Sequence, residues 1–138
     1  MKFLFDASSV LQLIRCSKED KALRILAENC ILDLTKYEIG NALWKEQMLH
    51  GAIGEEELSE FLDLLRSVVL RTKILTVDAE RLSEVAGVAA RERITFYDAS
   101  YITVAKIHSL TLVSEDRELV KAASKHARTS SSTGISPS

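Results

Sequence analysis

The feature that most constrains the fold is a short apolar run near the start of the chain, Phe3-Leu4-Phe5, which leads directly into Asp6. A brief apolar run bounded by small polar residues predicts a strand that is buried on both faces of a sheet. Asp6 then lies at the carboxyl end of this strand, where open α/β sheets bind their ligands. Because Asp also caps a following helix well, this residue alone leaves a structural and a functional interpretation open.

The pattern of a short apolar run followed by a helix recurs along the chain. Residues 30–34 and 111–114 predict two further strands, and 74–77 predicts a short strand or an extended connection. Apolar residues with helical spacing predict helices at about residues 7–14, 18–28, 36–49, 55–69, 79–92, 99–108 and 116–126. Thr35 is expected to cap the helix that it precedes. Strands that alternate with helices predict an α/β fold, a three-layer α/β/α sandwich with a central parallel sheet.

The length of 138 residues suits one domain with a real core but not two. We expect this domain to span residues 1–126. Residues 127–138 are rich in Ser and show no periodicity, so we expect a disordered tail there. No apolar run approaches the roughly 20 residues of a membrane helix, and the first residues do not resemble a signal peptide. We therefore expect a cytoplasmic protein without membrane contact.

The net charge and the cysteine content limit the kinds of ligand that the sequence predicts. The net charge of −2 gives the chain no overall basic field that would attract nucleic acid. Contact with RNA or DNA must therefore come from a local patch or through a bound metal. The chain's two cysteines have no CxxC spacing, and its three histidines are scattered, so the sequence does not predict a zinc site.

Four acidic residues share one kind of position. Asp6 and Asp116 each follow a predicted strand, whereas Glu38 and Asp98 open predicted helices. Because the carboxyl ends of parallel strands meet at one edge of the sheet, we expect the four side chains to lie together. Acids are also favoured at helix starts in their own right, so four independent helix caps remain the alternative.

A cluster of carboxylates predicts a site for a hard divalent cation. Carboxylates that share a cleft repel one another and lose hydration, which raises their pKa values unless a cation compensates. Mg²⁺ and Mn²⁺ prefer carboxylate and water oxygens, and they promote phosphodiester hydrolysis by activating water and stabilising phosphoryl charge. Asp6, Glu38, Asp98 and Asp116 are therefore the predicted catalytic and metal-binding residues. Ser8 could hydrogen-bond a carboxylate or a water beside the metal.

Four blocks of the sequence, in this order, resemble the PIN domains, and among them the VapC-type toxin ribonucleases. The blocks are residues 3–8, 37–44, 97–105 and 112–119, and the resemblance spans residues 2–119. No single block is specific, but four in the right order are strong. The Ser-rich tail matches nothing in that family.

The resemblance implies a PIN-like fold and a Mg²⁺- or Mn²⁺-dependent endoribonuclease that hydrolyses RNA with metal-activated water. By position, Asp6, Glu38 and Asp98 match the core acids of the family, Asp116 the fourth acid and Ser8 its hydroxyl residue. Members of this type usually dimerise and are held inactive by a small antitoxin protein. The resemblance thus implies a homodimer or a heterotetramer with a VapB-like antitoxin.

Other side chains give weaker signals. A phosphate-binding rim for RNA could be formed by Lys36, Lys45, Arg91, Arg93 and Lys106. Solvated helix faces explain these cations equally well. The apolar row at 58–65 is most simply core, although an exposed part of it could serve a partner helix as a groove.

Two other classes of function are alternatives to the nuclease. A receiver-like phosphoacceptor domain requires an acidic pair after its first strand and a Lys after its last. Here Phe5 precedes Asp6, and Glu115-Asp116 stand in the place of that Lys. A catalytically silent PIN-like binding module is the third class, and the intact acids argue against it. Of the last acidic pair, we expect Asp116 to face the site and Glu115 to face solvent or a surface cation.

Overall fold

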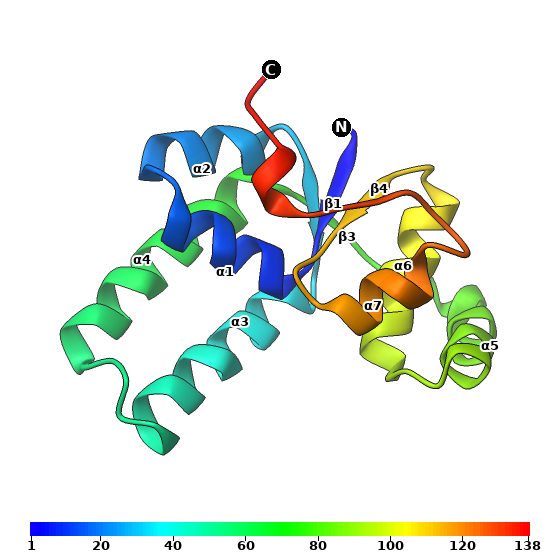
Figure 1. The fold of residues 1–138 in the computed structure, drawn as a ribbon, viewed down its shortest axis with the longest axis horizontal. Coiled ribbons are helices and arrows are strands. Elements are labelled where there is room, and N and C mark those ends of the chain that lie inside the picture. The colour runs from blue at the N-terminus through cyan, green and yellow to red at the C-terminus, as the bar shows by residue number, and fades with distance from the viewer.

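Five parallel strands form the centre of the computed structural model, which describes residues 1–138. The strands lie in the order β3-β2-β1-β4-β5 (Figure 1). Their bounds are β1 Phe3–Phe5, β2 Cys30–Leu32, β3 Lys73–Leu75, β4 Thr111–Val113 and β5 Thr129–Ser130. The α-helices are α1 Ala7–Cys16, α2 Glu19–Ala27, α3 Thr35–Trp44, α4 Glu55–Arg71, α5 Leu82–Glu92, α6 Phe96–Ile107 and α7 Arg117–Ala123. Shorter elements are a π-helix, η1 (Lys45–Leu49), and two 3₁₀ helices, η2 (Ala79–Arg81) and η3 (Ser132–Gly134).

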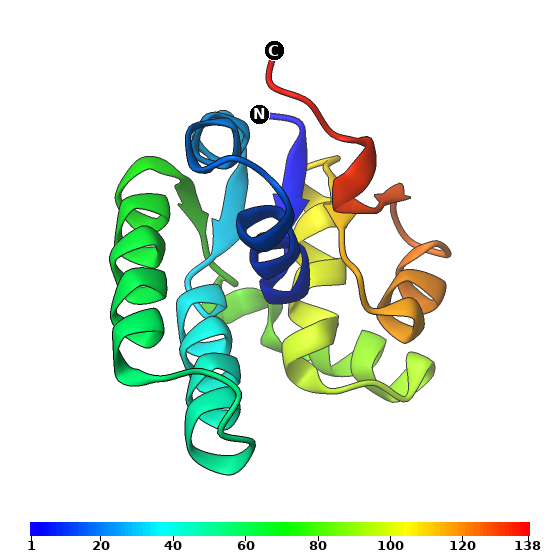
Figure 2. The same cartoon turned by 60° about the vertical axis from the view of Figure 1, so that its left-hand side comes forward.

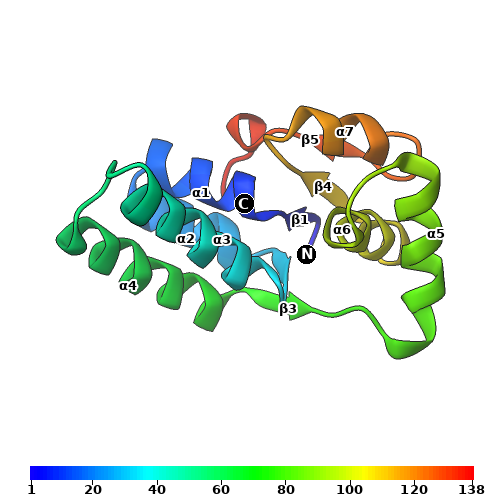
Figure 3. The same cartoon turned by 90° about the horizontal axis from the view of Figure 1, so that it is seen from below.

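Two helical layers cover the sheet, with α1 to α4 on one side and α5 to α7 on the other (Figure 3). Successive strand residues point to opposite layers, as the pleat requires. Leu4 and Leu112 pack with the layer of α5 to α7, whereas Phe5 and Val113 pack with α1 to α4. Burying each such side chain contributes about 1.5–3 kcal/mol. The predicted three-layer α/β/α fold is confirmed.

The carboxyl ends of the central strands meet at one edge of the sheet. Phe5 is in register with Val113, and Leu32 with Leu75, so neighbouring strands end at matching levels. Figure 2 shows α1 and α3 starting below the ends of β1 and β2. This edge is therefore where the first turns of the helices and the residues that follow the strands come together.

The start of α3 differs from the sequence prediction. The helix begins at Thr35 itself, and Leu34 occupies the N-cap position without a side-chain hydrogen bond. The Thr35 hydroxyl is fully buried and instead accepts a hydrogen bond from the Leu32 backbone N–H at 3.1 Å. The far end of the predicted helix continues as the π-helix η1 and is followed by Gly51, whose φ of 59° lies in the left-handed region.

The tail also differs from the prediction, because residues 127–138 are ordered rather than disordered. β5 pairs with β4, with Ser130 in register with Val113. Ile135 is 6% exposed and packs in the layer of α1 to α4. Ser132 N–H donates to Glu115 Oε1 at 2.7 Å. The position of residues 127–138 is fixed by the buried Ile135 and by the two-residue strand β5 at the sheet edge. Neither feature shows a periodic pattern from which it could be predicted.

No helix in the structure combines the length and apolarity needed to cross a membrane.

Candidate active site

Asp6 lies at the centre of the carboxyl edge and is 5% exposed. It follows β1 and caps α1, accepting a hydrogen bond from Ser9 N–H at 2.9 Å on Oδ1. Ser8 Oγ donates to the same oxygen at 2.7 Å, and Ser114 Oγ donates to Oδ2 at 2.5 Å. Burial raises the pKa of Asp6, and these hydrogen bonds partly offset the rise. The strand end and the helix start thus hold a desolvated carboxylate in a fixed orientation.

Two serine hydroxyls connect the ends of β1 and β4. Ser114 Oγ, which donates to Asp6, accepts a hydrogen bond from Asp116 N–H at 3.0 Å. Ser8 Oγ likewise accepts from Glu115 N–H at 2.9 Å. The loop between β4 and α7 is therefore connected to Asp6 by Ser114, which follows β4, and by Ser8, which lies in the first turn of α1.

Glu38 is held in place by a chain of hydroxyl groups that crosses the sheet edge. The Tyr101 hydroxyl donates to Glu38 Oε1 at 2.7 Å and lies 2.7 Å from Thr35 Oγ1. Tyr101 is 1% exposed within α6, whereas Glu38 lies half-buried in the first turn of α3. Helices from the two opposite layers thus meet at this carboxylate.

Asp98 and Asp116 complete the group from the openings of α6 and α7. Asp98 lies in the first turn of α6, where its N–H donates to the N-cap Thr95 Oγ1 at 3.1 Å. Asp116 is the N-cap of α7 and accepts from Glu118 N–H and Leu119 N–H through Oδ1. Capping therefore accounts for part of the role of Asp116.

The four carboxylates lie close enough to influence one another electrostatically. Burial raises the pKa of Glu38, and the charges of Asp98 and Asp6 raise it further, while the Tyr101 hydrogen bond lowers it. Burial also raises the pKa of Asp98, with added contributions from Asp116 and Asp6. Like charges that raise one another's pKa values in a desolvated cleft favour the binding of a cation.

The donor atoms fit a hard divalent cation, although they are not arranged as a finished ligand set. Carboxylate and hydroxyl oxygens are the donors that Mg²⁺ and Mn²⁺ prefer. No three Asp, Glu, His or Cys side chains are placed to hold a metal ion without moving. Both oxygens of Asp6 already accept hydrogen bonds. A cation would therefore need small side-chain rearrangements around the fixed Asp6.

The predicted basic rim is divided between different parts of the molecule. Lys36 lies in the first turn of α3, with its ammonium 5.2 Å from the Tyr37 ring centre. Arg93 ends α5 in a left-handed conformation (φ 56°), shortly before the acidic end of α6. Lys106 lies in the last turn of α6, at the opposite edge of the sheet, so its assignment to this rim is wrong. Helix α6 extends away from the acids, and the eight-residue separation of Asp98 and Lys106 corresponds to about 12 Å along the helix axis.

Two side chains that contact the acids were not singled out from the sequence, Ser114 and Tyr101. Thr35, which contacts the Tyr101 hydroxyl, was predicted only as a helix cap. Ser114 had a usable signal, because a hydroxyl residue directly after the apolar Leu112-Val113 lies at a strand exit. Tyr101 is one of two tyrosines in α6, and its contact with Glu38 depends on tertiary packing. Glu115 is exposed, in agreement with the prediction that it faces solvent or a surface cation, and its Oε1 also accepts from the backbone N–H of Ser132.

Comparisons with known proteins agree with this architecture. Residues 3–125 match the family model described as PIN domain. The chain is 39% identical to a Pyrobaculum aerophilum protein named Exonuclease VapC9 over 87% of its own length and 84% of the relative. It is 31% identical to Ribonuclease VapC3 of the same organism, over 88% and 94%. The crystal structure of PAE2754 from Pyrobaculum aerophilum superposes with a TM-score of 0.76 at 38% identity, covering 94% of this chain and 90% of that one. The chain belongs to the PIN domain family.

Proposed function

We propose that this protein is a metal-dependent endoribonuclease of the VapC type, the toxin of a toxin–antitoxin pair. The observation that carries the proposal is the group of four carboxylates, the buried Asp6 and three neighbours, in which nearby negative charges raise the pKa values of Glu38 and Asp98. Its relatives named Exonuclease VapC9 and Ribonuclease VapC3 support a nuclease that acts on RNA. The receiver-like alternative finds no support in these relatives.

Each acidic residue has a role in this proposal. Asp6, Glu38 and Asp98 would hold Mg²⁺ or Mn²⁺, and Asp116 would hold a second ion or orient the attacking water. When bound, the metal supplies an activated water and stabilises charge on the phosphoryl oxygens. Ser8 and Ser114 position Asp6, and Tyr101 positions Glu38. Of the predicted rim, Lys36 and Arg93 shortly precede Glu38 and Asp98 in the chain and could contact RNA phosphates.

The experiment uses a circular single-stranded RNA of mixed sequence, with linear RNA and circular DNA of the same sequence beside it. An endoribonuclease opens the RNA circle, whereas an exonuclease degrades only the linear form. Cleavage should require Mg²⁺ or Mn²⁺, stop with EDTA and be lost in Glu38→Gln. Glu60→Gln, which removes an exposed carboxylate on α4, is the matched control. Cleavage that persists in EDTA and in Glu38→Gln contradicts the proposal, and degradation of linear RNA alone contradicts its endonucleolytic part.

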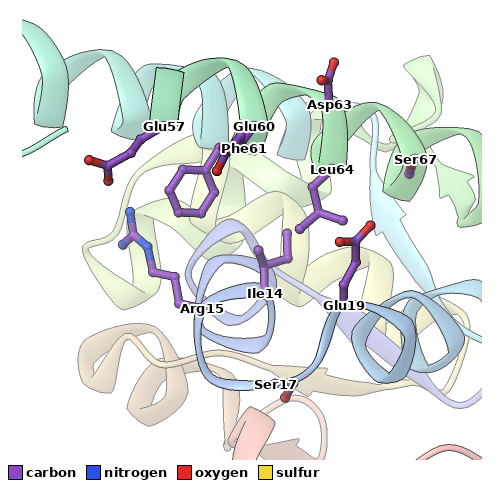
Figure 4. Close-up of a pocket in the computed structure, with 10 residues that line it drawn as sticks. All are labelled: Ile14, Arg15, Ser17, Glu19, Glu57, Glu60, Phe61, Asp63, Leu64 and Ser67. Carbon is purple, nitrogen blue, oxygen red and sulfur yellow. The ribbon is translucent and has the colours of Figure 1, made fainter. Parts of the chain in front are cut away.

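A groove between α1 and α4, with a volume of about 680 Å³, is the candidate binding site for the antitoxin (Figure 4). Ile14, Phe61 and Leu64 give it an apolar floor, and four carboxylates surround them: Glu19, Glu57, Glu60 and Asp63. The single cation, Arg15, lies over the Phe61 ring at 5.2 Å and forms an ion pair with Glu46 at 2.5 Å. The groove is therefore apolar at its floor and acidic at its rim.

We propose that the antitoxin places an apolar segment with basic residues in this groove and extends a basic side chain to the acids. An Arg fork matches carboxylates in two-point contacts, and metal-free carboxylates gain most from it. Co-expression with the small protein encoded by the adjacent gene should give an inactive complex, a heterotetramer if the nuclease dimerises. A crystal structure of the complex should show the segment in the groove and a cation beside Asp98. An acidic edge left open to solvent in an inactive complex would contradict the second contact.

A further inference from the structure

The edge of the sheet opposite the acids carries a basic pocket, here called the amino-edge pocket, with a volume of about 430 Å³. Its lining includes three cations and one histidine: Lys2, Lys106, Arg128 and His126. The remaining polar side chains of the pocket are the hydroxyls of Ser109 and Thr111. No carboxylate lines it. In a chain whose net charge is −2, this local excess of positive charge is unusual.

The topology of the sheet brings these cations together from distant parts of the sequence. Lys2 precedes β1, and its carbonyl accepts from Thr111 N–H at 3.1 Å. Arg128 precedes β5, and its carbonyl accepts from Leu112 N–H at 2.8 Å. Lys106 lies in the last turn of α6, which packs against β4. The start of β4 is thus flanked by the basic residues that directly precede its two neighbouring strands, β1 and β5, and by a third basic residue on α6.

The three cations have no acidic partner. Neither Lys2, Lys106 nor Arg128 forms a salt bridge. The carboxylate that reaches a pocket residue is Glu92, which binds Lys125 at 2.9 Å and His126 at 3.5 Å. A cation in the last turn of a helix interacts favourably with the helix dipole, which accounts for Lys106. That effect does not explain why Lys2 and Arg128 converge on the same pocket.

We propose that the amino-edge pocket binds a phosphate group. A guanidinium fork, two ammonium groups and two hydroxyls supply the charge-assisted donors that a phosphate accepts. The phosphate can belong to the backbone of an RNA bound by the protein or to a small phosphorylated molecule. The pocket shares no residue with the acidic site, so this proposal does not depend on the proposed nuclease activity.

The test is carried out in EDTA, because metal-free acids repel phosphate and leave the pocket as the place where an anion binds. Sodium tripolyphosphate is titrated by calorimetry, and a short fluorescein-labelled single-stranded RNA by anisotropy. Both probes are applied to wild type, Lys106→Gln and Arg128→Gln. Arg66→Gln is the matched control, since Arg66 is an exposed cation on α4 in the other helical layer and forms no salt bridge.

Each pocket variant should weaken the binding of a phosphate probe by about tenfold, and Arg66→Gln should change it by less than about twofold. Loss confined to RNA identifies backbone phosphates as the ligand, and loss confined to tripolyphosphate identifies a small phosphorylated ligand. If both are lost, displacement of the RNA by tripolyphosphate shows that they share the pocket. The proposal is overturned if wild type binds neither probe, if the pocket variants bind like wild type, or if Arg66→Gln loses as much affinity as they do.

Discussion

Ser114 Oγ donates a 2.5 Å hydrogen bond to Asp6 Oδ2 and so connects the residue that follows β4 to the residue that follows β1. The two strands are neighbours in the sheet, with Phe5 in register with Val113. The same oxygen of Ser114 accepts from Asp116 N–H, so one hydroxyl touches two of the four acidic residues. Strand register thereby fixes the orientation of a buried carboxylate.

Ser114→Ala should reduce RNA cleavage and Mn²⁺ affinity by about 10- to 100-fold, the range typical of groups that orient a metal ligand. Loss of this donor should also raise the pKa of Asp6 further, because the hydrogen bond lowers it. The acid limb of the pH–activity profile then moves to higher pH, a shift that a purely structural role would not produce. Ser124→Ala, at an exposed hydroxyl on the C-cap of α7, is the control and should behave like wild type.

Tyr101→Phe should leave the fold intact and alter Glu38. The variant removes the donor to Glu38 Oε1 and the partner of the buried Thr35 hydroxyl, so the free energy of unfolding should fall by about 1–3 kcal/mol. The pKa of Glu38 should rise, since the phenol lowers it. Titration of the Glu38 side chain by NMR measures this directly, and an unchanged pKa would show that the hydrogen bond is not formed in solution.

The stability of the metal-free protein should decrease as the pH rises from acidic to neutral. Burial raises the pKa values of Asp6, Glu38 and Asp98 above their ordinary values. At a pH between the unfolded-state and the folded-state pKa of each group, the folded protein therefore binds more protons than the unfolded protein. Stability then falls with rising pH through the raised folded pKa values. Thermal unfolding in EDTA across this range checks the sign, and Asp6→Asn should flatten the dependence. A stability that rises over the same interval in wild type but not in Asp6→Asn would contradict the burial of that carboxylate.

Asp116→Asn separates charge from capping, because Asn also caps helices. The free energy of unfolding should change by less than about 0.5 kcal/mol, while most of the RNA cleavage is lost. Removal of the Asp116 charge should also lower the pKa of Asp98, which that charge raises. Glu115→Gln should retain activity, since its side chain binds Ser132 N–H in the tail. Inactive Glu115→Gln beside active Asp116→Asn would reverse the assignment of the fourth acid.

The order of the first four strands and of the helices could be predicted because each of these strands ends in apolar residues that are followed by a polar residue. β5, which is Thr129–Ser130, has no such run and was not predicted. The same rule located Asp6 and Asp116, whose positions depend on where β1 and β4 end. Glu38 and Asp98 were found from helix starts, although α6 begins three residues earlier than predicted, so Asp98 lies inside its first turn.

The remaining details depend on contacts between distant residues. The local sequence predicts that Thr35 caps a helix, yet its hydroxyl is buried against Tyr101 of the opposite layer. Ile135 is an isolated apolar residue in a Ser-rich segment, and only the finished core shows where it packs. Lys106 lies only eight residues after Asp98 in the sequence, which suggested a position near the acids. The direction of α6 instead places Lys106 at the other edge of the sheet. Sequence spacing carries no information on such long-range placements.

The central claim is that the carboxylates around Asp6 form one metal site, and calorimetric titration with Mn²⁺ tests it most directly. Wild type should bind Mn²⁺, Asp98→Asn and Glu38→Gln should each lose about tenfold or more in affinity, and Asp63→Asn on α4 should bind like wild type. Absence of Mn²⁺ binding at millimolar concentrations, or equal affinity in wild type and both site variants, would contradict the account.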